Sequence, residues 1–144
     1  MRLPTLLALA LIATLKADPL PEELRQNGWF IGCQAYTFNR FSAFEAIAKT
    51  KEAGGNLIEF YPGQILKPGS KEKVNHSMSA EAMAELQAEL KRQGVRAVNY
   101  GVVGANSPEE VGKIMAFAKK MGLYAVCTES TEQIVAWEKA AIEH

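Results

Sequence analysis

The segment NLIEFYPGQIL, residues 56–66, decides how the rest of the chain is interpreted. Its first half is apolar and aromatic, as expected for a buried β-strand, and it stops abruptly at Pro62-Gly63. Glu59 nevertheless places a carboxylate in the middle of this strand. Because burying a charge without a partner is costly, this pattern predicts that Glu59 has polar neighbours on adjacent strands or faces a binding site.

The first 17 residues are typical of a secretory signal peptide. Arg2 precedes an uncharged apolar run, and Lys16-Ala17 is followed by Asp18-Pro19. The run is shorter than the roughly 20 apolar residues of a membrane span, although a retained N-terminal membrane anchor is the alternative. We therefore expect a signal peptide at 1–17, a linker at 18–29, one domain at 30–144, no stable membrane span, and a periplasmic or secreted protein.

The composition favours some partners and argues against others. Lysines and arginines number 16, as do aspartates and glutamates, so no basic excess favours a nucleic-acid partner. Cys33 and Cys127 could pair in an exported protein, but both fall in predicted strands and point to opposite faces. We interpret them as small buried hydrophobes. With no CxxC pair and only two histidines, no zinc site is predicted.

Four strand-helix units follow one another along the chain. Apolar strand patterns cover residues 30–38, 56–61, 95–103 and 123–129, and helices begin after Ser42, Ser79, Ser107 and Ser130. Strands separated by helices predict parallel pairing with right-handed crossovers. The longest connection, residues 62–78, follows the second strand at its carboxyl end, where α/β proteins bind their ligands.

Each predicted strand carries one polar residue on one of its two faces. Strand alternation assigns these positions to Gln34, Glu59, Asn99 and Glu129, and it groups Ala97 with Asn99. A doubly wound sheet is covered by helices on both faces and should be apolar on both, so the pattern favours a barrel over a flavodoxin-like sheet. The polar residues either satisfy one another in a polar layer or border a binding site.

Several segments together resemble a known family. These are IGCQAYTFNRF (31–41), LIEFYPGQ (57–64), NHSMS (75–79), AVNYGVVG (97–104), and AKKMG (118–122) with CTES (127–130). In this order they resemble the xylose isomerase-like TIM-barrel superfamily of sugar phosphate isomerases and epimerases, and more narrowly its exported bacterial branch. The likeness runs from about residue 28 to the end and corresponds to the N-terminal half of that fold. The predicted fold class is therefore α/β, with the first four β-α units of a TIM barrel.

The resemblance implies a site and a cofactor. A complete barrel has eight strands and about 250 residues, with the site at the carboxyl ends of the strands. The family binds a divalent metal (Mn, Mg, Co or Zn) through glutamate, aspartate and histidine residues of strands five to eight, so no metal ligand is assigned in this chain. The implied pocket-wall residues are Tyr36, Glu59, Tyr61, Gln64, His76, Asn99, Tyr100 and, at the border, Glu129; no catalytic residue is assigned.

The resemblance also implies a reaction. In the family, the metal polarises the oxygens of a carbohydrate while carboxylates move a proton beside the sugar carbonyl. We expect this chain to be inactive alone, with the remaining groups supplied by a second copy in a homodimer or by a missing C-terminal half. The alternatives are an exported non-catalytic domain that dimerises to cover its sheet edges and an open α/β domain for a small ligand. No nucleotide-binding glycine motif is present in the sequence.

Overall fold

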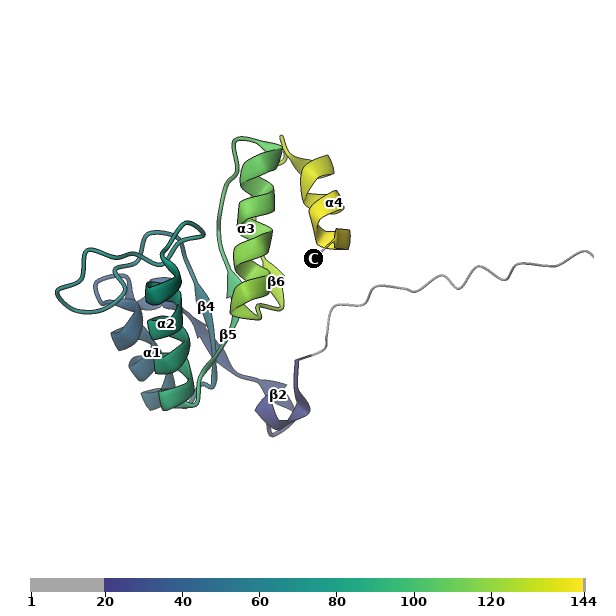
Figure 1. Cartoon of the computed structure of the whole chain (residues 1–144). Helices are drawn as coiled ribbons and strands as arrows, with labels where there is room; N and C mark the ends of the chain where they lie inside the picture. The colour runs from purple at the N-terminus through teal and green to yellow at the C-terminus, as the bar shows by residue number, and fades with distance from the viewer. Residues whose placement is uncertain (1–19, 144) are drawn as a thin grey trace, which may run out of the picture.

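A computed structural model describes residues 20–143 as an α/β fold (Figure 1). The predicted signal peptide, residues 1–17, lies outside the described residues. Four parallel strands form one sheet in the order β3-β4-β5-β6, so the predicted parallel pairing is confirmed. The strands are β3 (Gly32–Gln34), β4 (Leu57–Phe60), β5 (Arg96–Tyr100) and β6 (Ala125–Val126). The helices are α1 (Ala43–Glu52), α2 (Ala80–Gln93), α3 (Pro108–Met121) and α4 (Ile134–Glu143).

The first three helices begin at the predicted serine caps. The Ser42 hydroxyl accepts the Glu45 N–H, and the Glu45 carboxylate accepts the Ser42 N–H in return, which completes a capping box. The Ser79 hydroxyl caps α2 by accepting the Ala82 N–H, and the Ser107 hydroxyl caps α3 by accepting the Glu110 N–H. Gly94 and Gly122 end α2 and α3 in the left-handed conformation, which glycine adopts without a steric penalty.

The cap predicted for the fourth helix is wrong. Ser130 does not cap a helix; its N–H donates to the Thr128 hydroxyl at 3.1 Å, and α4 begins only at Ile134. The preceding strand is shorter than predicted as well, because β6 covers Ala125–Val126 and not residues 123–129. The connection between β6 and α4 is therefore longer than predicted.

The first predicted strand is also too long. β3 ends at Gln34, and a 3-10 helix, η2 (Ala35–Phe38), follows it. Before β3, a short hairpin pairs β1 (Arg25–Gln26) with β2 (Trp29–Phe30), after the 3-10 turn η1 (Glu22–Leu24). The segment expected as a linker, residues 18–29, thus contains ordered backbone pairing.

A bulge in β5 changes which residues share a face. Ile58 pairs with Ala97 and Glu59 pairs with Asn99, so Val98 is an extra residue on β5. The prediction that Ala97 shares a face with Asn99 is therefore wrong, and Ala97 is buried in the core at 3 % exposure. The register still pairs one residue from each strand across the sheet, namely Gln34 with Glu59, Glu59 with Asn99, and Asn99 with Ala125.

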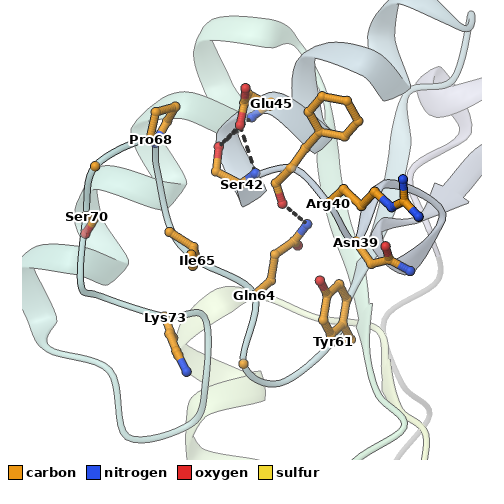
Figure 2. A pocket seen from close by; sticks show the side chains of 13 residues that line it. Asn39, Arg40, Ser42, Glu45, Tyr61, Gln64, Ile65, Pro68, Ser70 and Lys73 are labelled. Carbon is orange, nitrogen blue, oxygen red and sulfur yellow. Dashed lines mark hydrogen bonds between the residues drawn. The ribbon is translucent and has the colours of Figure 1, made fainter.

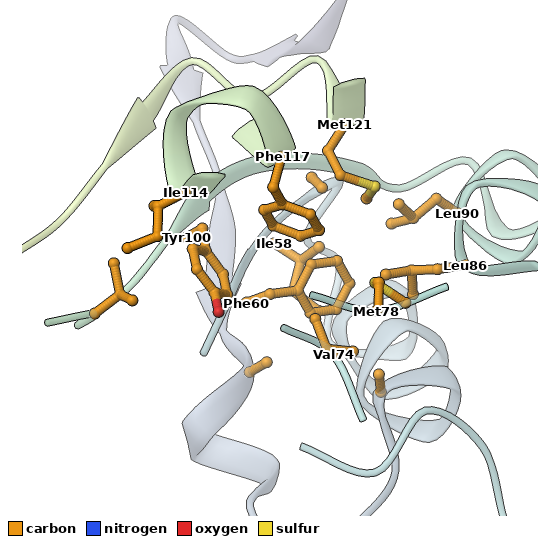
Figure 3. Packing of buried hydrophobic residues seen from close by; sticks show 14 of the residues in the cluster. Ile58, Phe60, Val74, Met78, Leu86, Leu90, Tyr100, Ile114, Phe117 and Met121 are labelled. Carbon is orange, nitrogen blue, oxygen red and sulfur yellow. The ribbon is translucent and has the colours of Figure 1, made fainter. Parts of the chain in front are cut away.

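The core lies between the helices and the opposite face of the sheet. Ile58, Phe60 and Tyr100 point from the strands into this layer and are almost fully buried. Figure 3 shows them packed against side chains of α2 and α3, which include Leu86, Leu90, Ile114, Phe117 and Met121. Neighbouring helices also pack in pairs, α1 with α2 and α3 with α4, as Figure 1 shows. The helices therefore cover one face of the sheet and leave the row of Gln34, Glu59 and Asn99 on the other.

Within the part of the chain that the structure describes, none of the helices has the length and hydrophobicity needed to cross a membrane.

Candidate functional site

Four side chains, one from each strand or its end, form a hydrogen-bonded row on the face of the sheet opposite the core. The Gln34 Nε2 donates to Glu59 Oε1 at 3.4 Å. The Asn99 Nδ2 donates to Glu59 Oε2 at 3.1 Å and to Cys127 Sγ, also at 3.1 Å. We call Gln34, Glu59, Asn99 and Cys127 the polar row. The predicted polar neighbours of Glu59 are therefore present.

Glu59 accepts hydrogen bonds from its two neighbours in the row and can accept further ones. Each carboxylate oxygen receives one amide N–H, from Gln34 on one side and from Asn99 on the other. A carboxylate offers about four lone-pair positions, so two remain for a ligand. Glu59 is partly exposed and Gln34 is exposed, so a ligand on this face can reach them. The row can therefore accept hydrogen bonds from neighbouring hydroxyl groups.

Two tyrosines stand at the carboxyl end of the strands that carry Gln34 and Glu59. Tyr36 and Tyr61 meet edge to face, with ring centroids 5.0 Å apart and an angle of 76° between the ring planes. Partial burial, and secondarily the nearby Tyr36 hydroxyl, raise the pKa of Tyr61 above its ordinary value. Tyr36 is 56 % exposed, so its ring is accessible to a ligand.

Tyr100, predicted as a pocket-wall residue, lies in the core instead. Its ring packs against Phe117 with centroids 5.0 Å apart, on the face of the sheet opposite the polar row. Burial raises the pKa of Tyr100 to about 12, and the nearby backbone of His76 opposes part of this shift. Among residues 20–143, the Tyr100 hydroxyl has no hydrogen-bond partner of ordinary length.

Because Tyr100 is buried in its neutral form, we expect the protein to lose stability at alkaline pH. A raised pKa means that the neutral form stabilises the fold fully below about pH 10, and that this contribution falls as the pH rises toward about 12. We expect Tyr100→Phe to reduce the alkaline loss by about 2–3 kcal/mol, as measured by urea unfolding at about pH 8 and about pH 12. Tyr124→Phe, at a residue that is 51 % exposed, should keep the wild-type profile. Equal alkaline losses in Tyr100→Phe and the wild type would contradict the expectation.

The predicted residue His76 does not join the row. It lies in the loop after β4, and its Nε2 is 3.8 Å from Glu110 Oε1 in the first turn of α3. Hydrogen bonds from Asn106, chiefly from its backbone N–H, lower the pKa of Glu110. His76 therefore contacts α3 and does not contact the polar row.

Gln64 holds the loop after β4 against the segment before α1. Its side chain is 2 % exposed, and Nε2 donates to the Phe41 carbonyl at 3.2 Å and the Phe38 carbonyl at 3.5 Å. Figure 2 shows this side chain reaching from the loop toward the opposite wall of a cleft, with the bond to Phe41 dashed. Gln64 therefore joins two loops at the carboxyl end of the sheet and is not part of the row.

On the last strand the sequence predicted Glu129 as the residue of the polar face, whereas Cys127 is the one that bonds Asn99. Glu129 is exposed beyond β6 and forms no hydrogen bond to the row. Cys127 takes the fourth position, and it is an exposed free thiol where a buried hydrophobe was expected. Cys33 is a partly buried free thiol. The two-residue alternation that relates Cys127 to Ala125 already placed Cys127 on this face and was the available signal.

The described residues do not fit a metal centre. Within residues 20–143, no group of three or more histidine, cysteine, aspartate or glutamate side chains comes together in a metal-binding arrangement. The polar row contributes one carboxylate and one thiol, whereas catalytic metal sites in proteins commonly use three protein ligands. No step through a metal is therefore derived from these residues.

Comparisons with known proteins support the fold and leave the activity open. No protein-family model matches the chain, and no curated protein matches it. The crystal structure of an uncharacterised protein from Parabacteroides distasonis ATCC 8503 is similar, with a TM-score of 0.75 and 29 % sequence identity. The match covers 80 % of this chain and 49 % of that one, so this chain spans about half the length of the structure it matches.

Proposed function

We propose that this chain forms part of a carbohydrate-binding site of the xylose isomerase-like TIM-barrel type, with the polar row as its floor. The observation that carries the proposal is Glu59, held between amide donors from both neighbouring strands on the sheet face that the helices leave bare. In the family that the sequence resembles, this face would be the inside of the barrel. The reaction proposed for the complete site is isomerisation or epimerisation of a sugar.

The strand order supports the barrel part of the proposal. Consecutive strands lie side by side in the order β3-β4-β5-β6, and right-handed crossovers then carry the connecting helices to one face. A doubly wound sheet instead reverses its strand order and has helices on both faces. The small residues Gly32 and Gly101 further allow close strand approach, since a Cβ on either would lie 2.5 Å from a neighbouring backbone oxygen.

The chemistry of the row supports a carbohydrate ligand. The carboxylate of Glu59 can accept hydrogen bonds from sugar hydroxyls, the amides beside it can donate them, and the exposed ring of Tyr36 offers an apolar surface nearby. In the proposed role, Glu59 accepts hydrogen bonds from the sugar, Gln34 and Asn99 hold Glu59 in place, and Tyr36 covers a face of the sugar ring. These residues bind and orient the carbohydrate.

Titration of the whole chain with neutral monosaccharides tests this proposal. We expect saturable binding of at least one aldose or ketose by isothermal titration calorimetry. Tyr36→Ala should weaken the binding about tenfold, because an aromatic contact contributes about 1 kcal/mol or more beyond its burial. Tyr124→Ala is the matched control at a similarly exposed tyrosine outside the row and should bind like the wild type. Failure of every tested monosaccharide to bind would refute the proposal.

A further inference from the structure

Both edges of the parallel sheet are open. Within residues 20–143, β3 and β6 stand at the two ends of the strand order and pair with no further strand of the sheet. An open edge presents backbone N–H and carbonyl groups that can pair with another chain. The helices cover one face of this sheet, and the polar row lies on the other. In the proposed function that second face is the inside of a barrel, and a barrel is closed only when both edges are paired.

Helix α4 carries exposed apolar side chains near the β6 edge. It follows β6, packs against α3 and ends the row of helices on that side (Figure 1). Trp137 and Ala140 are buried, whereas Ile134, Val135 and Ile142 are 62 %, 75 % and 60 % exposed. Val135 and Ile142 are seven positions apart and therefore share one face of the helix. Large apolar side chains that gather on one exposed face indicate a contact surface.

The β3 edge also has exposed apolar side chains. Ile31, directly before β3, is exposed, and so is Phe41, directly before the cap of α1. Helix α1 packs against α2 and stands at the opposite end of the row of helices from α4 (Figure 1). Each end of the half-barrel therefore presents an unpaired strand edge and an apolar surface beside it.

The charges at the two ends are complementary. Residues 129–143, which include α4, contain four glutamates and one lysine, a formal charge of −3. Residues 40–52, which include α1, contain three basic and two acidic residues, a formal charge of +1. Among residues 20–143, Glu138 has no cation and Lys49 and Lys51 have no carboxylate within ion-pair distance. Opposite charges at the two ends favour contact between α4 of one copy and α1 of another.

We propose that two copies of this chain close a barrel of eight parallel strands, with the site between their two polar rows. β6 of each copy pairs with β3 of the other, and α4 of each copy packs against α1 of the other. All four strands of one copy are parallel, so a twofold axis along the strands keeps all eight parallel and forms the same contact twice. Two copies of residues 20–143 also match the about 250 residues of a typical barrel.

The inference rests on the proposed function, because that function makes the face with the polar row the inside of a barrel. It names the partner that completes the site as a second copy of this chain. The wall opposite Glu59 then comes from the polar row of that copy.

Sedimentation velocity of the whole chain without ligand tests the inference, and we expect twice the mass of one chain. Val135→Asp/Ile142→Asp should raise the dimer dissociation constant more than about 100-fold, because two apolar side chains are lost from each of two contacts. Ala84→Asp/Ala88→Asp is the matched control at exposed positions of α2, which contacts the inner strand β5, and it should stay dimeric. A wild-type mass of one chain at every concentration, or an equal loss in the control, would overturn the inference.

Charge reversal tests which surfaces meet. Glu132→Lys/Glu138→Lys makes the α4 end basic, and Lys49→Glu/Lys51→Glu makes the α1 end acidic. Each variant alone should dimerise at least about tenfold more weakly than the wild type, since like charges then meet in both contacts. An equimolar mixture should dimerise again, because a basic end then faces an acidic end in both contacts. Dimerisation of Lys49→Glu/Lys51→Glu on its own as strong as that of the wild type would overturn the arrangement.

Lys119→Glu/Lys120→Glu is the matched control for the α1 variant. It makes the same change in the last turn of α3, where both lysines are exposed. This control should dimerise like the wild type, and circular dichroism should show the same helix content in every variant. An equal weakening in the control would show that net charge, and not contact between α4 and α1, governs association, and it would overturn the arrangement.

Titration with monosaccharides separates this inference from the proposed function. A chain that sediments as a monomer and still binds a monosaccharide refutes only the inference. A dimer that depends on α4 but binds no monosaccharide refutes the proposed function and leaves the dimer in place.

Discussion

The Glu59→Gln variant is expected to bind monosaccharides about 10–100-fold more weakly than the wild type. Both Glu59 oxygens accept amide hydrogens, at 3.4 Å from Gln34 and at 3.1 Å from Asn99. Glutamine has one oxygen and one NH₂ group, so in either orientation one neighbouring donor faces another donor. The row should then rearrange, and the acceptor positions offered to sugar hydroxyls should be lost. Isothermal titration calorimetry with the sugar that binds the wild type measures the change.

Glu129→Gln provides the matched control for this variant. It makes the same chemical change at an exposed carboxylate that forms no bond to the row. Sugar affinity should therefore equal that of the wild type. A similar loss in both variants would show that general charge, and not the geometry of the row, governs binding.

The Gly101→Ala variant is expected to lower the free energy of unfolding by about 2–3 kcal/mol. A Cβ at Gly101 would lie 2.5 Å from the Cys127 carbonyl oxygen and 2.7 Å from the Cys127 Cβ. Both atoms belong to the segment that follows β6. The Cys127 N–H donates to the Tyr100 carbonyl, and the Cys127 carbonyl accepts the Val103 N–H. The segment must move to accept the methyl group, and the short pairing between β5 and β6 should weaken. Urea unfolding followed by circular dichroism measures the loss.

Gly112→Ala is the opposite case and serves as the control. Gly112 lies inside α3, and a Cβ there would have no heavy atom within 4 Å. Alanine restricts the unfolded chain and favours the helix, so this variant should be more stable by about 0.5–1 kcal/mol. A Gly101→Ala variant as stable as the wild type would contradict the close approach of β5 to the segment after β6.

The features that the sequence predicted well depend on local chemistry. Ser42, Ser79 and Ser107 begin helices because their hydroxyls accept backbone N–H groups within the same turn. Gly94 and Gly122 end helices because glycine tolerates the left-handed conformation. Alternation of strands and helices then implies parallel pairing, which the structure confirms.

The features that the sequence missed depend on contacts between distant segments. The bulge at Val98 adds one residue to β5, and strand alternation gives no sign of such an insertion. The aromatic residues after Gln34 favour a strand by composition, yet residues 35–38 turn into η2, whose Phe38 carbonyl is bonded by Gln64 from another loop. Tertiary contacts override strand propensity at this point.

At the candidate site, too, local sequence patterns predicted some features, and contacts between distant segments determined the others. Strand alternation placed Gln34, Glu59 and Asn99 on one face, and the register confirms that placement. Alternation also placed Tyr100 on the face opposite Asn99, and the structure buries it there in the core, so only the pocket-wall role that the resemblance implied for Tyr100 is wrong. The cleft between the segment before α1 and the loop after β4 was missed because its lining residues come from two loops that are far apart in the sequence.

The side-chain amide resonances of Gln34 and Asn99 provide the most direct test of the polar row as a carbohydrate site. Both NH₂ groups donate to Glu59, so a sugar that bonds to Glu59 must change their surroundings. In a ¹⁵N-resolved NMR titration with the monosaccharide that binds, we predict that both NH₂ signals shift and saturate together. Saturable binding that leaves both signals unchanged would contradict the account.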